Sequence, residues 1–271
     1  MGGIGIFHIR KSLWAVLCVL VALGCTPVQG PRDSAQQFAG ILRQYPRTTE
    51  PLRVQKLSGA AASPELRKAG VPEVTIIVHP AYSVFLRDLA REAYPDVKYR
   101  LLKKQFYNEA TFMAERAEAG GILVLIIPGN YSTESFSPLS YTSYLNAVAS
   151  RGPSVFSLFS KTSSTGVIAV DDMISLYRFL QDVNANTVMV GGGYIGRCQR
   201  EFYDQLTNFI DRTRTYIAPE ISTISPDDVS EREASRILAG LRRRDYTSVK
   251  QFIDRQTEGN VNILPVPRKE D

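Results

Sequence analysis

The sequence predicts an α/β fold, with a doubly wound, mainly parallel sheet of about six strands in a three-layer sandwich. Two observations predict it. Uncharged, β-prone runs alternate with segments of helical periodicity from residue 73 to residue 255, and glycine or proline separates many of them. Parallel neighbours need a crossover connection, usually a helix, so this alternation favours parallel strands covered on both faces.

Residues 1–25 have the pattern of a secretory signal. Arg10 and Lys11 precede an uncharged apolar run, Ser12 to Leu23. That run is shorter than the roughly 20 residues that a helix needs to span a bilayer, and it has the proportions of a signal sequence.

The end of this segment, Val21-Ala-Leu-Gly-Cys25, resembles the lipobox of bacterial lipoproteins, with Ala22 where Leu is commoner. The resemblance implies that Cys25 becomes the first mature residue and carries the lipid, palmitate included. Thr26 follows instead of Asp, which in a Gram-negative host implies the outer membrane, with the domain facing the periplasm. The alternative is an ordinary signal peptide with a chance cysteine.

Residues 26–70 are predicted to be a tether, because prolines, glycines and a run of alanines interrupt any long element. A tether would let a lipid-anchored domain stand off the membrane. Asp33 to Gln44 is the one short amphipathic helix predicted there.

The folded domain is predicted at 71–258, followed by a polar tail at 259–271. Apolar β-prone runs predict the strands, of which Ile122 to Ile127 is the most apolar, and 3.6-residue periodicity predicts the helices. The predicted strands are 74–79, 98–102, 122–127, 154–159, 187–190 and 215–218. The predicted helices are 82–94, 108–119, 139–150, 171–183, 198–211, 227–243 and 246–255.

The charge gives no basis for a nucleic-acid footprint, which would need clustered charge, and no nucleic-acid partner is expected. The net charge is +5, and Arg10 and Lys11 in the signal supply two of these charges. The dense cluster Arg242-Arg243-Arg244 falls at a predicted helix end, where cations suit the helix dipole, so a binding patch is the weaker interpretation. The expected partners are the membrane, through the lipid, and a small molecule or protein in the periplasm.

Polar and glycine-rich residues follow most of the predicted strands, at the edge where open parallel sheets bind ligands. They include His79-Pro80, Pro128-Gly129-Asn130, Ser160-Lys161-Thr162 and the stretch Gly191 to Cys198. Gly192, Gly193, Asn130 and Arg197 are therefore the candidate ligand-binding residues.

Cys198 is the candidate nucleophile. Cys18 leaves with the signal and Cys25 takes the lipid, so the folded part has one thiol and no intrachain disulfide. A helix N-terminus and the neighbouring Arg197 and Arg200 would lower its pKa, and the glycines would offer backbone donors to an oxyanion. The alternative is a buried, inert cysteine at the first helical turn.

A strand followed by Gly192, five residues and then Cys198 resembles the isochorismatase-like cysteine hydrolases. The resemblance implies a catalytic Lys at the end of the preceding strand, which Lys161 matches. It also implies an Asp at the end of the first strand, where this sequence has His79. The resemblance therefore implies Cys198 as nucleophile, Lys161 as electrostatic stabiliser and, in place of the family's Asp, His79 as base.

Other chemistries are less favoured. Gly191-x-Gly193-x-x-Gly196, with Glu220 as a ribose acid, matches the dinucleotide fingerprint but follows a late strand in an exported protein. Asp171-Asp172 fits a helix start better than a metal site. His79 is the one histidine of the mature chain, which excludes metal sites with several histidines. No metal and no cofactor is expected. The tyrosines at 131, 141 and 144 either line a pocket or cover the sheet.

Two hypotheses result from these patterns. The first is a lipid-anchored α/β domain that binds a small molecule or protein and has lost catalysis. The second is a hydrolase of amides or related bonds with Cys198 as its nucleophile. They differ in whether the thiol is accessible and activated.

Overall fold

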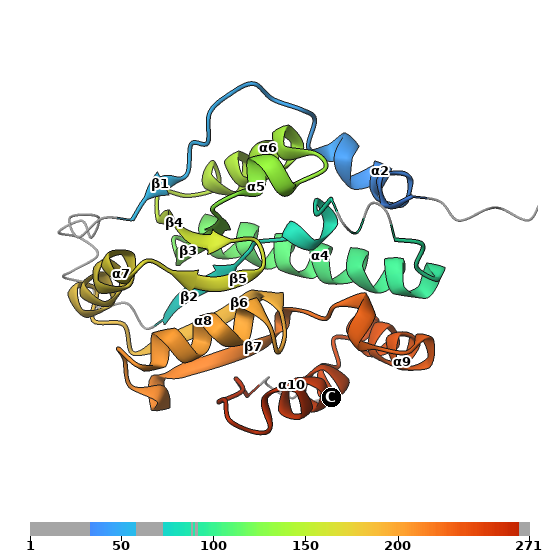
Figure 1. The fold of residues 1–271 in the computed structure, drawn as a ribbon. Coiled ribbons are helices and arrows are strands. Elements are labelled where there is room, and N and C mark those ends of the chain that lie inside the picture. Colours follow the sequence, from blue (N-terminus) through green and yellow to red (C-terminus); the bar gives the residue numbers. More distant parts are fainter. Residues whose placement is uncertain (1–32, 58–72, 88, 90–91, 266–271) are drawn as a thin grey trace, which may run out of the picture. The chain divides into compact units, whose positions relative to one another are not determined.

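The computed structural model describes residues 33–57 and 73–265, apart from residues 88, 90 and 91. Within that part of the chain a seven-stranded sheet has the order β1-β4-β3-β2-β6-β7 (Figure 1). The seventh strand, β5, pairs with the C-terminal end of β4. Every strand pair is parallel except β4 with β5. The strands are β1 (Gln55–Lys56), β2 (Glu73–Val78), β3 (Ile122–Pro128), β4 (Val155–Thr162), β5 (Thr165–Ile168), β6 (Thr187–Tyr194) and β7 (Thr215–Thr223).

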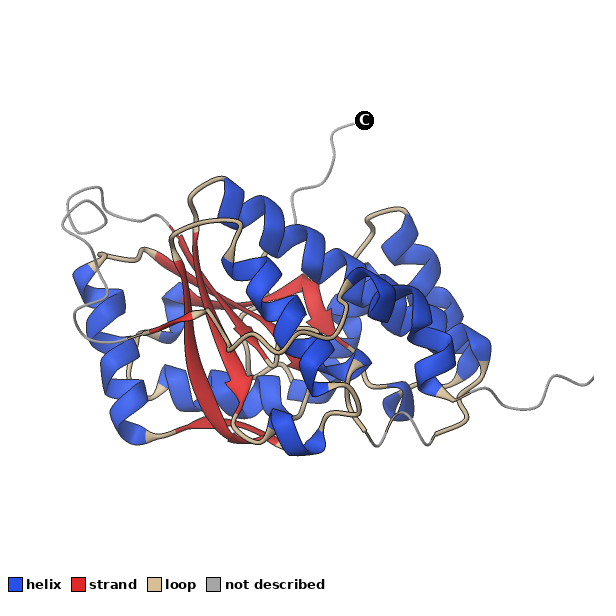
Figure 2. Cartoon of the chain, turned by 90° about the horizontal axis from the view of Figure 1, so that it is seen from above, coloured by secondary structure: helices blue, strands red, loops and turns tan. Residues whose placement is uncertain are grey.

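Helices cover both faces of the sheet, as Figures 1 and 2 show. One hydrophobic core joins a face of the sheet to α2, α4 and α6. The other core joins the opposite face to α7, α8, α9 and α10. The predicted α/β three-layer architecture is confirmed. The helices are α2 (Ser34–Gln44), α4 (Asp96–Glu118), α5 (Tyr131–Glu134), α6 (Pro138–Ala149), α7 (Val170–Asp182), α8 (Cys198–Thr207), α9 (Glu231–Arg242) and α10 (Thr247–Thr257).

The burial of the central strand β3 explains why its sequence is apolar throughout. Every residue of β3 is buried, and β3 lies between β2 and β4 with helices on both faces. A strand covered on both faces cannot alternate apolar with polar residues, so it appears as a continuous aliphatic run. The six-residue run at 122–127 therefore predicted β3 correctly.

Two predicted elements between β2 and β3 are wrong. Tyr82–Val84 is a single 3-10 turn rather than the start of a helix over 82–94. The strand predicted over 98–102 is helical and belongs to α4. The alternating pattern of Val97, Tyr99 and Leu101 resembles a strand, but Tyr99 and Leu102 share the buried face of a long helix with Phe106.

Within the range 26–70 the helix predicted at Asp33 to Gln44 is confirmed as α2, but the described residues differ from a tether. α2 buries Phe38 and Ile41 in the core, and Asp33 caps its first turn. Residues 55 and 56 form β1, which pairs with β4. The described residues 33–57 are thus part of the domain instead of a tether. The signal and Cys25 lie outside the described residues, as do residues 58–72.

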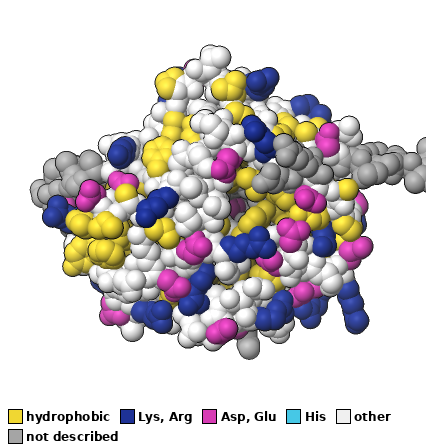
Figure 3. All heavy atoms as spheres, viewed as in Figure 1, with side chains coloured by type: hydrophobic (Ala, Val, Ile, Leu, Met, Phe, Trp, Pro, Cys, Tyr) yellow, Lys and Arg dark blue, Asp and Glu magenta, His cyan; other side chains and the backbone are white. Residues whose placement is uncertain are grey.

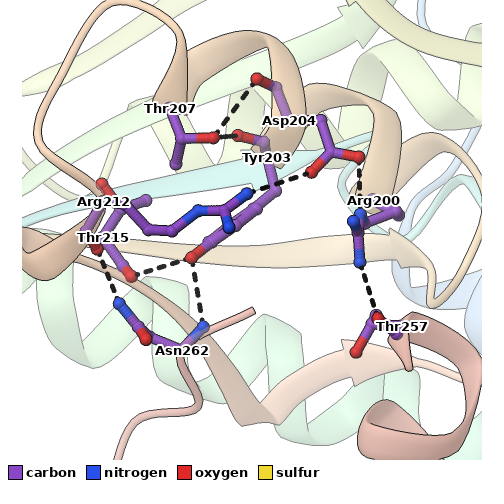
Figure 4. Close-up of polar contacts among 8 residues, drawn as sticks. All are labelled: Arg200, Tyr203, Asp204, Thr207, Arg212, Thr215, Thr257 and Asn262. Carbon is purple, nitrogen blue, oxygen red and sulfur yellow. Dashed lines mark hydrogen bonds and ion pairs between the residues drawn. The ribbon is translucent and has the colours of Figure 1, made fainter. Parts of the chain in front are cut away.

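The C-terminal segment is attached to the domain rather than forming a polar tail from residue 259. Ile217 N–H donates to Asn262 O at 2.8 Å, and Leu264 N–H donates to Ile217 O at 2.9 Å. The hydroxyl of Tyr203 in α8 accepts from Asn262 N–H at 3.1 Å (Figure 4). The segment therefore runs beside the first part of the edge strand β7.

Two helix starts differ in detail from prediction. Ser225 caps a 3-10 turn, Pro226–Asp228, and α9 begins only after Ser230, whose side chain accepts from Glu233 N–H. Asp171 and Asp172 lie in the first turn of α7, as expected for charges near a helix N-terminus, but neither side chain caps it.

The surface of the described residues carries both signs of charge. Figure 3 shows lysines and arginines interspersed with aspartates and glutamates on the face it presents. A search of the described helices for one that is long and apolar enough to cross a bilayer finds none.

Candidate functional site

The strand order places one crevice at the centre of the sheet. β2 pairs with β3 on one side and with β6 on the other, and the chain winds outward from β2 in both directions. Open α/β sheets bind ligands at such a reversal, beyond the carboxyl ends of the strands. His79 follows β2 and Cys198 follows β6, and both line a small cavity there with Gly193 and Tyr194.

The cavity is small. Its volume of about 30 Å³ has room for about two water molecules. Its lining also includes Tyr82 and Leu86, which leave more apolar than polar surface. The structure therefore brings the predicted thiol and histidine to one place, but the space between them is too small for an organic substrate.

His79 is held by its neighbours at the end of β2. Its backbone is left-handed, with φ 47°, and its N–H donates to Ile126 O at 2.8 Å. Its Nε2 lies 2.9 Å from the Ser160 hydroxyl, which itself donates to Thr162 O. Since that hydroxyl proton is in use, the Ser160 oxygen is the acceptor and Nε2–H the donor. Burial lowers the pKa of His79 to about 4, so the ring is neutral at pH 7.

The sulfur of Cys198 is enclosed by backbone. Sγ accepts from Tyr194 N–H at 3.2 Å, and a Cβ on Gly193 would lie 3.0 Å from it. Cys198 is only 5% exposed. Burial raises the pKa of the thiol to about 11, and hydrogen bonds from the backbone of Tyr194 and Gln199 offset only part of this. At neutral pH the group is a thiol and not a thiolate.

The β4–β5 hairpin, which the sequence did not predict, covers the start of α8. The Glu201 carboxylate in α8 accepts two hydrogen bonds from this hairpin. The Thr165 hydroxyl donates at 2.6 Å and the Gly166 N–H at 3.1 Å. A Cβ on Gly166 would lie 1.8 Å from Cys198 O. This close contact keeps solvent from one side of the helix N-terminus, and the Glu201 charge opposes ionisation of the thiol.

The cations expected to activate Cys198 have other roles. Arg197 is exposed and forms an ion pair with Asp228 at 2.5 Å. Arg200 pairs with Asp204 at 2.6 Å and donates to Thr257 O, as Figure 4 shows. The prediction that these cations lower the thiol pKa is wrong: the pKa of Cys198 is raised, and each arginine is paired with an aspartate.

Lys161 does not reach the cavity. β4 continues through Thr162, so Lys161 lies within a strand, and its exposed side chain leaves on the face opposite to Ser160. The residue that meets His79 from β4 is Ser160. Lys161 is therefore not placed to stabilise charge at Cys198, which is a correction to the predicted triad.

Asn130, Gly192 and Gly193 have structural roles in the loops and strands around the cavity. Asn130 Oδ1 accepts from Ser163 N–H at 2.7 Å, and its amide donates to Glu134. Gly192 and Gly193 extend β6 rather than forming a turn, with φ 66° and 57°. Gly192 O accepts from Gln199 Nε2 at 2.8 Å. Of the predicted ligand-binding residues, only Gly193 lines the cavity.

A buried acid that the sequence analysis missed lies behind this site. Glu109 in α4 is 1% exposed, and its Oε1 accepts from Ala81 N–H at 2.6 Å. Burial raises its pKa to about 8. Tyr141 and Tyr144 pack in the same core and are fully buried, so they cover the sheet instead of lining a pocket. A glutamate within the apolar stripe of a helix was the available signal.

Glu220 does not follow a strand. β7 runs to Thr223, so Glu220 lies in its middle and not at the ligand-binding edge that a ribose acid would need. Among the described residues, no group of three or more histidines, cysteines or carboxylates could hold a metal ion.

Comparisons with known proteins give little further information. No family model matches the chain, and no curated protein matches it. Among solved structures, the YcaC gene product of Escherichia coli, described as an octameric hydrolase of unknown specificity, aligns with a TM-score of 0.39. The two chains are 8% identical over 80% of this chain and 79% of that chain. A likeness this weak supports no conclusion about activity.

Proposed function

We propose that this protein is a non-catalytic binding domain, anchored to the outer membrane through a lipid on Cys25. One observation supports the loss of catalysis above the others: the Cys198 sulfur is buried, accepts a backbone hydrogen bond and has its pKa raised to about 11. A cysteine nucleophile needs a thiolate at working pH and access to substrate, and this thiol has neither.

The test is the reaction of Cys198 with a thiol reagent across pH. The protein carries Cys18→Ser and Cys25→Ser, so that Cys198 is the only thiol. We expect labelling of the folded protein at pH 8 to be at least about a hundredfold slower than after unfolding in guanidinium, since the pKa is about two units higher when folded. Fast labelling of the folded protein with a midpoint below pH 8 would contradict the proposal.

The second candidate is a thiol hydrolase, which one observation favours. Cys198 and His79 line the same cavity at the reversal of strand order. For such an enzyme, the β4–β5 hairpin would have to move from α8, widen the cavity and free Sγ. His79→Asn would then abolish amide hydrolysis and slow labelling of Cys198. Under the binding proposal it changes neither.

The anchor is tested separately. Cells expressing the wild-type chain are grown with a clickable palmitate analogue, and the protein is purified and examined for the label. We expect the label on the wild-type protein, and a soluble, unlabelled product from Cys25→Ser. A wild-type chain released into the periplasm without label would show that Val21 to Cys25 is an ordinary signal cleavage site.

A further inference from the structure

A second hollow in the described part of the molecule is a groove between α4, β7 and the linker that joins α9 to α10. Its volume is about 800 Å³, within the range of small-molecule sites. One wall is a face of α4 on which Lys104, Asn108, Thr111 and Glu115 follow each other at helical spacing. The other is the linker between α9 and α10, with part of β7 between them. Figure 1 shows α4 and these C-terminal helices on neighbouring sides of β7.

Two carboxylates form an acidic region in this groove. Glu220 from β7 and Glu115 from α4 both line it, and neither makes an ion pair with any described residue. Glu73, by contrast, is paired with Arg116 at 2.9 Å. Burial and the charges of Glu73 and Glu115 raise the pKa of Glu220, so this carboxyl lacks the cation that would stabilise its ionised form.

A basic region lies on the facing wall. Arg243 and Arg244 come from the α9–α10 linker and Lys250 from α10. Asp245 also lines the groove, and its carboxylate interacts with the charge of Arg243. Arg244 and Lys250 form no ion pair with a described residue. Arg244 has a left-handed backbone, with φ 58°. The charge of Glu220 raises the pKa of Tyr246 and the charge of Arg244 lowers it. The acidic and the basic region therefore both lie close enough to Tyr246 to interact with its hydroxyl. A ligand of moderate length can therefore reach both.

Apolar and amide groups also line the groove. Tyr107 is 40% exposed, unusually so for an aromatic residue here, and Phe112 and Ile221 line the groove beside it. Asn108 Nδ2 is buried in the wall and donates to none of the described residues. A buried amide donor without an acceptor is unusual, and a rotation of this side chain would present it to a ligand carbonyl.

We propose that this groove binds a short peptide with free ends, its ammonium group at Glu220 and Glu115 and its carboxylate at Arg243 and Arg244. An extended tripeptide spans roughly 10 Å, comparable with the range over which a charge acts in physiological salt. Two adjacent guanidiniums suit a carboxylate, and an apolar central side chain would pack on Tyr107. The inference rests on the proposed binding function and gives it a site and a ligand class.

The probe is the tripeptide Ala-Phe-Ala, titrated calorimetrically into the full chain with Cys18→Ser and Cys25→Ser. We expect saturable binding below about 1 mM. Blocking the amino end by acetylation, or the carboxyl end by amidation, should weaken it about tenfold, since a hydrogen bond to a charged group contributes on that order. No saturation by about 10 mM peptide would overturn the proposal.

Paired variants assign each end. Glu220→Gln should weaken binding of the free tripeptide about tenfold and leave binding of the acetylated tripeptide unchanged. Arg244→Gln should also weaken binding of the free tripeptide about tenfold, and it should leave binding of the amidated tripeptide unchanged. Glu118→Gln and Arg242→Gln, which lie on α4 and α9 outside the groove, are the matched controls. Equal losses with blocked and free peptides would overturn the assignment of the ends.

The two proposals fail separately. If Cys198 labels rapidly in the folded protein while the tripeptide binds as described, the non-catalytic function is wrong and the groove stands. If Cys198 is protected and no tripeptide binds, only the groove inference is wrong.

Discussion

At the scale of single residues, the turn after β2 is held in an uncommon backbone conformation. His79 and Ala81 both have positive φ, 47° and 52°, on either side of Pro80. Such angles cost of order 1–3 kcal/mol each for residues other than glycine. Glu109 accepts from Ala81 N–H and Ser160 accepts from His79, so buried polar contacts offset this strain.

Glu109→Gln should change how stability depends on pH. The carboxyl holds its proton to about pH 8 when folded, against an ordinary pKa of 4.5. The native state therefore binds more protons between these values, and stability falls as pH rises from 4.5 to 8. Gln keeps a neutral acceptor for Ala81 N–H. We expect the variant to lose this fall, worth up to about 5 kcal/mol. Urea unfolding at pH 5, 7 and 9 measures it.

His79 acts in the opposite direction, and its pH range overlaps that of Glu109 between pH 4.5 and 6.5. Its pKa is about 4 when folded against 6.5 ordinarily, so stability falls as pH drops from 6.5 to 4. In wild type the two opposite slopes cancel between pH 4.5 and 6.5, so the fall in stability toward acid pH should be visible in Glu109→Gln and masked in wild type. A Glu109→Gln protein with an unchanged slope between pH 6.5 and 8 would show that the carboxyl is ionised in the fold.

At the scale of elements, the end of β6 shows why this strand contains three glycines. Gly192 pairs with Val78 and has φ 66°, and a Cβ there would lie 2.3 Å from Val78 O. The backbones of β2 and β6 approach too closely for any side chain at this point. The same close approach keeps the cavity between His79 and Cys198 small.

Gly192→Ala should therefore be much more destabilising than Gly120→Ala. Both glycines have positive φ, but a Cβ on Gly120 meets nothing within 4 Å. Gly120→Ala should cost only the conformational term of about 1 kcal/mol, and Gly192→Ala at least about 3 kcal/mol because backbone must also move. Guanidinium denaturation of both variants gives the comparison. Equal losses would mean that β2 and β6 can separate without cost.

Burial decides which elements were predictable from sequence. β3 and β4 are apolar because helices cover them, so their sequences predict strands without reference to anything distant. The sequence predicts a strand at the first turns of α4 because the apolar residues there fit both the helical and the strand period over a short window. β5 has four residues, and hydrogen bonds with Glu201 and Gln205 hold it against α8, which no local pattern reveals.

At the scale of the whole molecule, both ends of the described chain are packed against the domain. α2 buries Phe38 against Tyr99 of α4, with ring centroids 5.7 Å apart. At the other end, residues 262 and 264 bond to β7. The domain therefore extends over more of the sequence than the range 71–258 predicted from composition.

Phe38→Ala tests this extension. Removing a fully buried phenylalanine from a core costs about 3–5 kcal/mol, whereas a residue in a tether contributes nothing to folding. We expect the loss in a single transition that also includes the sheet, followed by circular dichroism and by the fluorescence of the tyrosines. Gln36→Ala, on the exposed face of α2, is the control and should be close to wild type.

The site was only partly predictable for the same reason. The pattern of strand, glycines and Cys198 predicts the thiol at the sheet edge that His79 also reaches, and both residues line one cavity there. Whether a thiol is activated depends on whether the neighbouring cations are paired with other groups. Arg197 binds Asp228, which is 31 residues away, and Arg200 binds Asp204, which is 4 residues away. The groove joins α4 to a linker more than 120 residues later, so sequence patterns within one element could not reveal it.

The strand-like pairing of residues 262–264 with Ile217 also has a practical consequence for anyone producing this protein. A protein expressed only to residue 258 would leave the backbone N–H and C=O groups at the start of β7 unpaired. Exposed edge strands of this kind pair with other chains and cause aggregation. An affinity tag is better joined beyond residue 265, where that border is already closed.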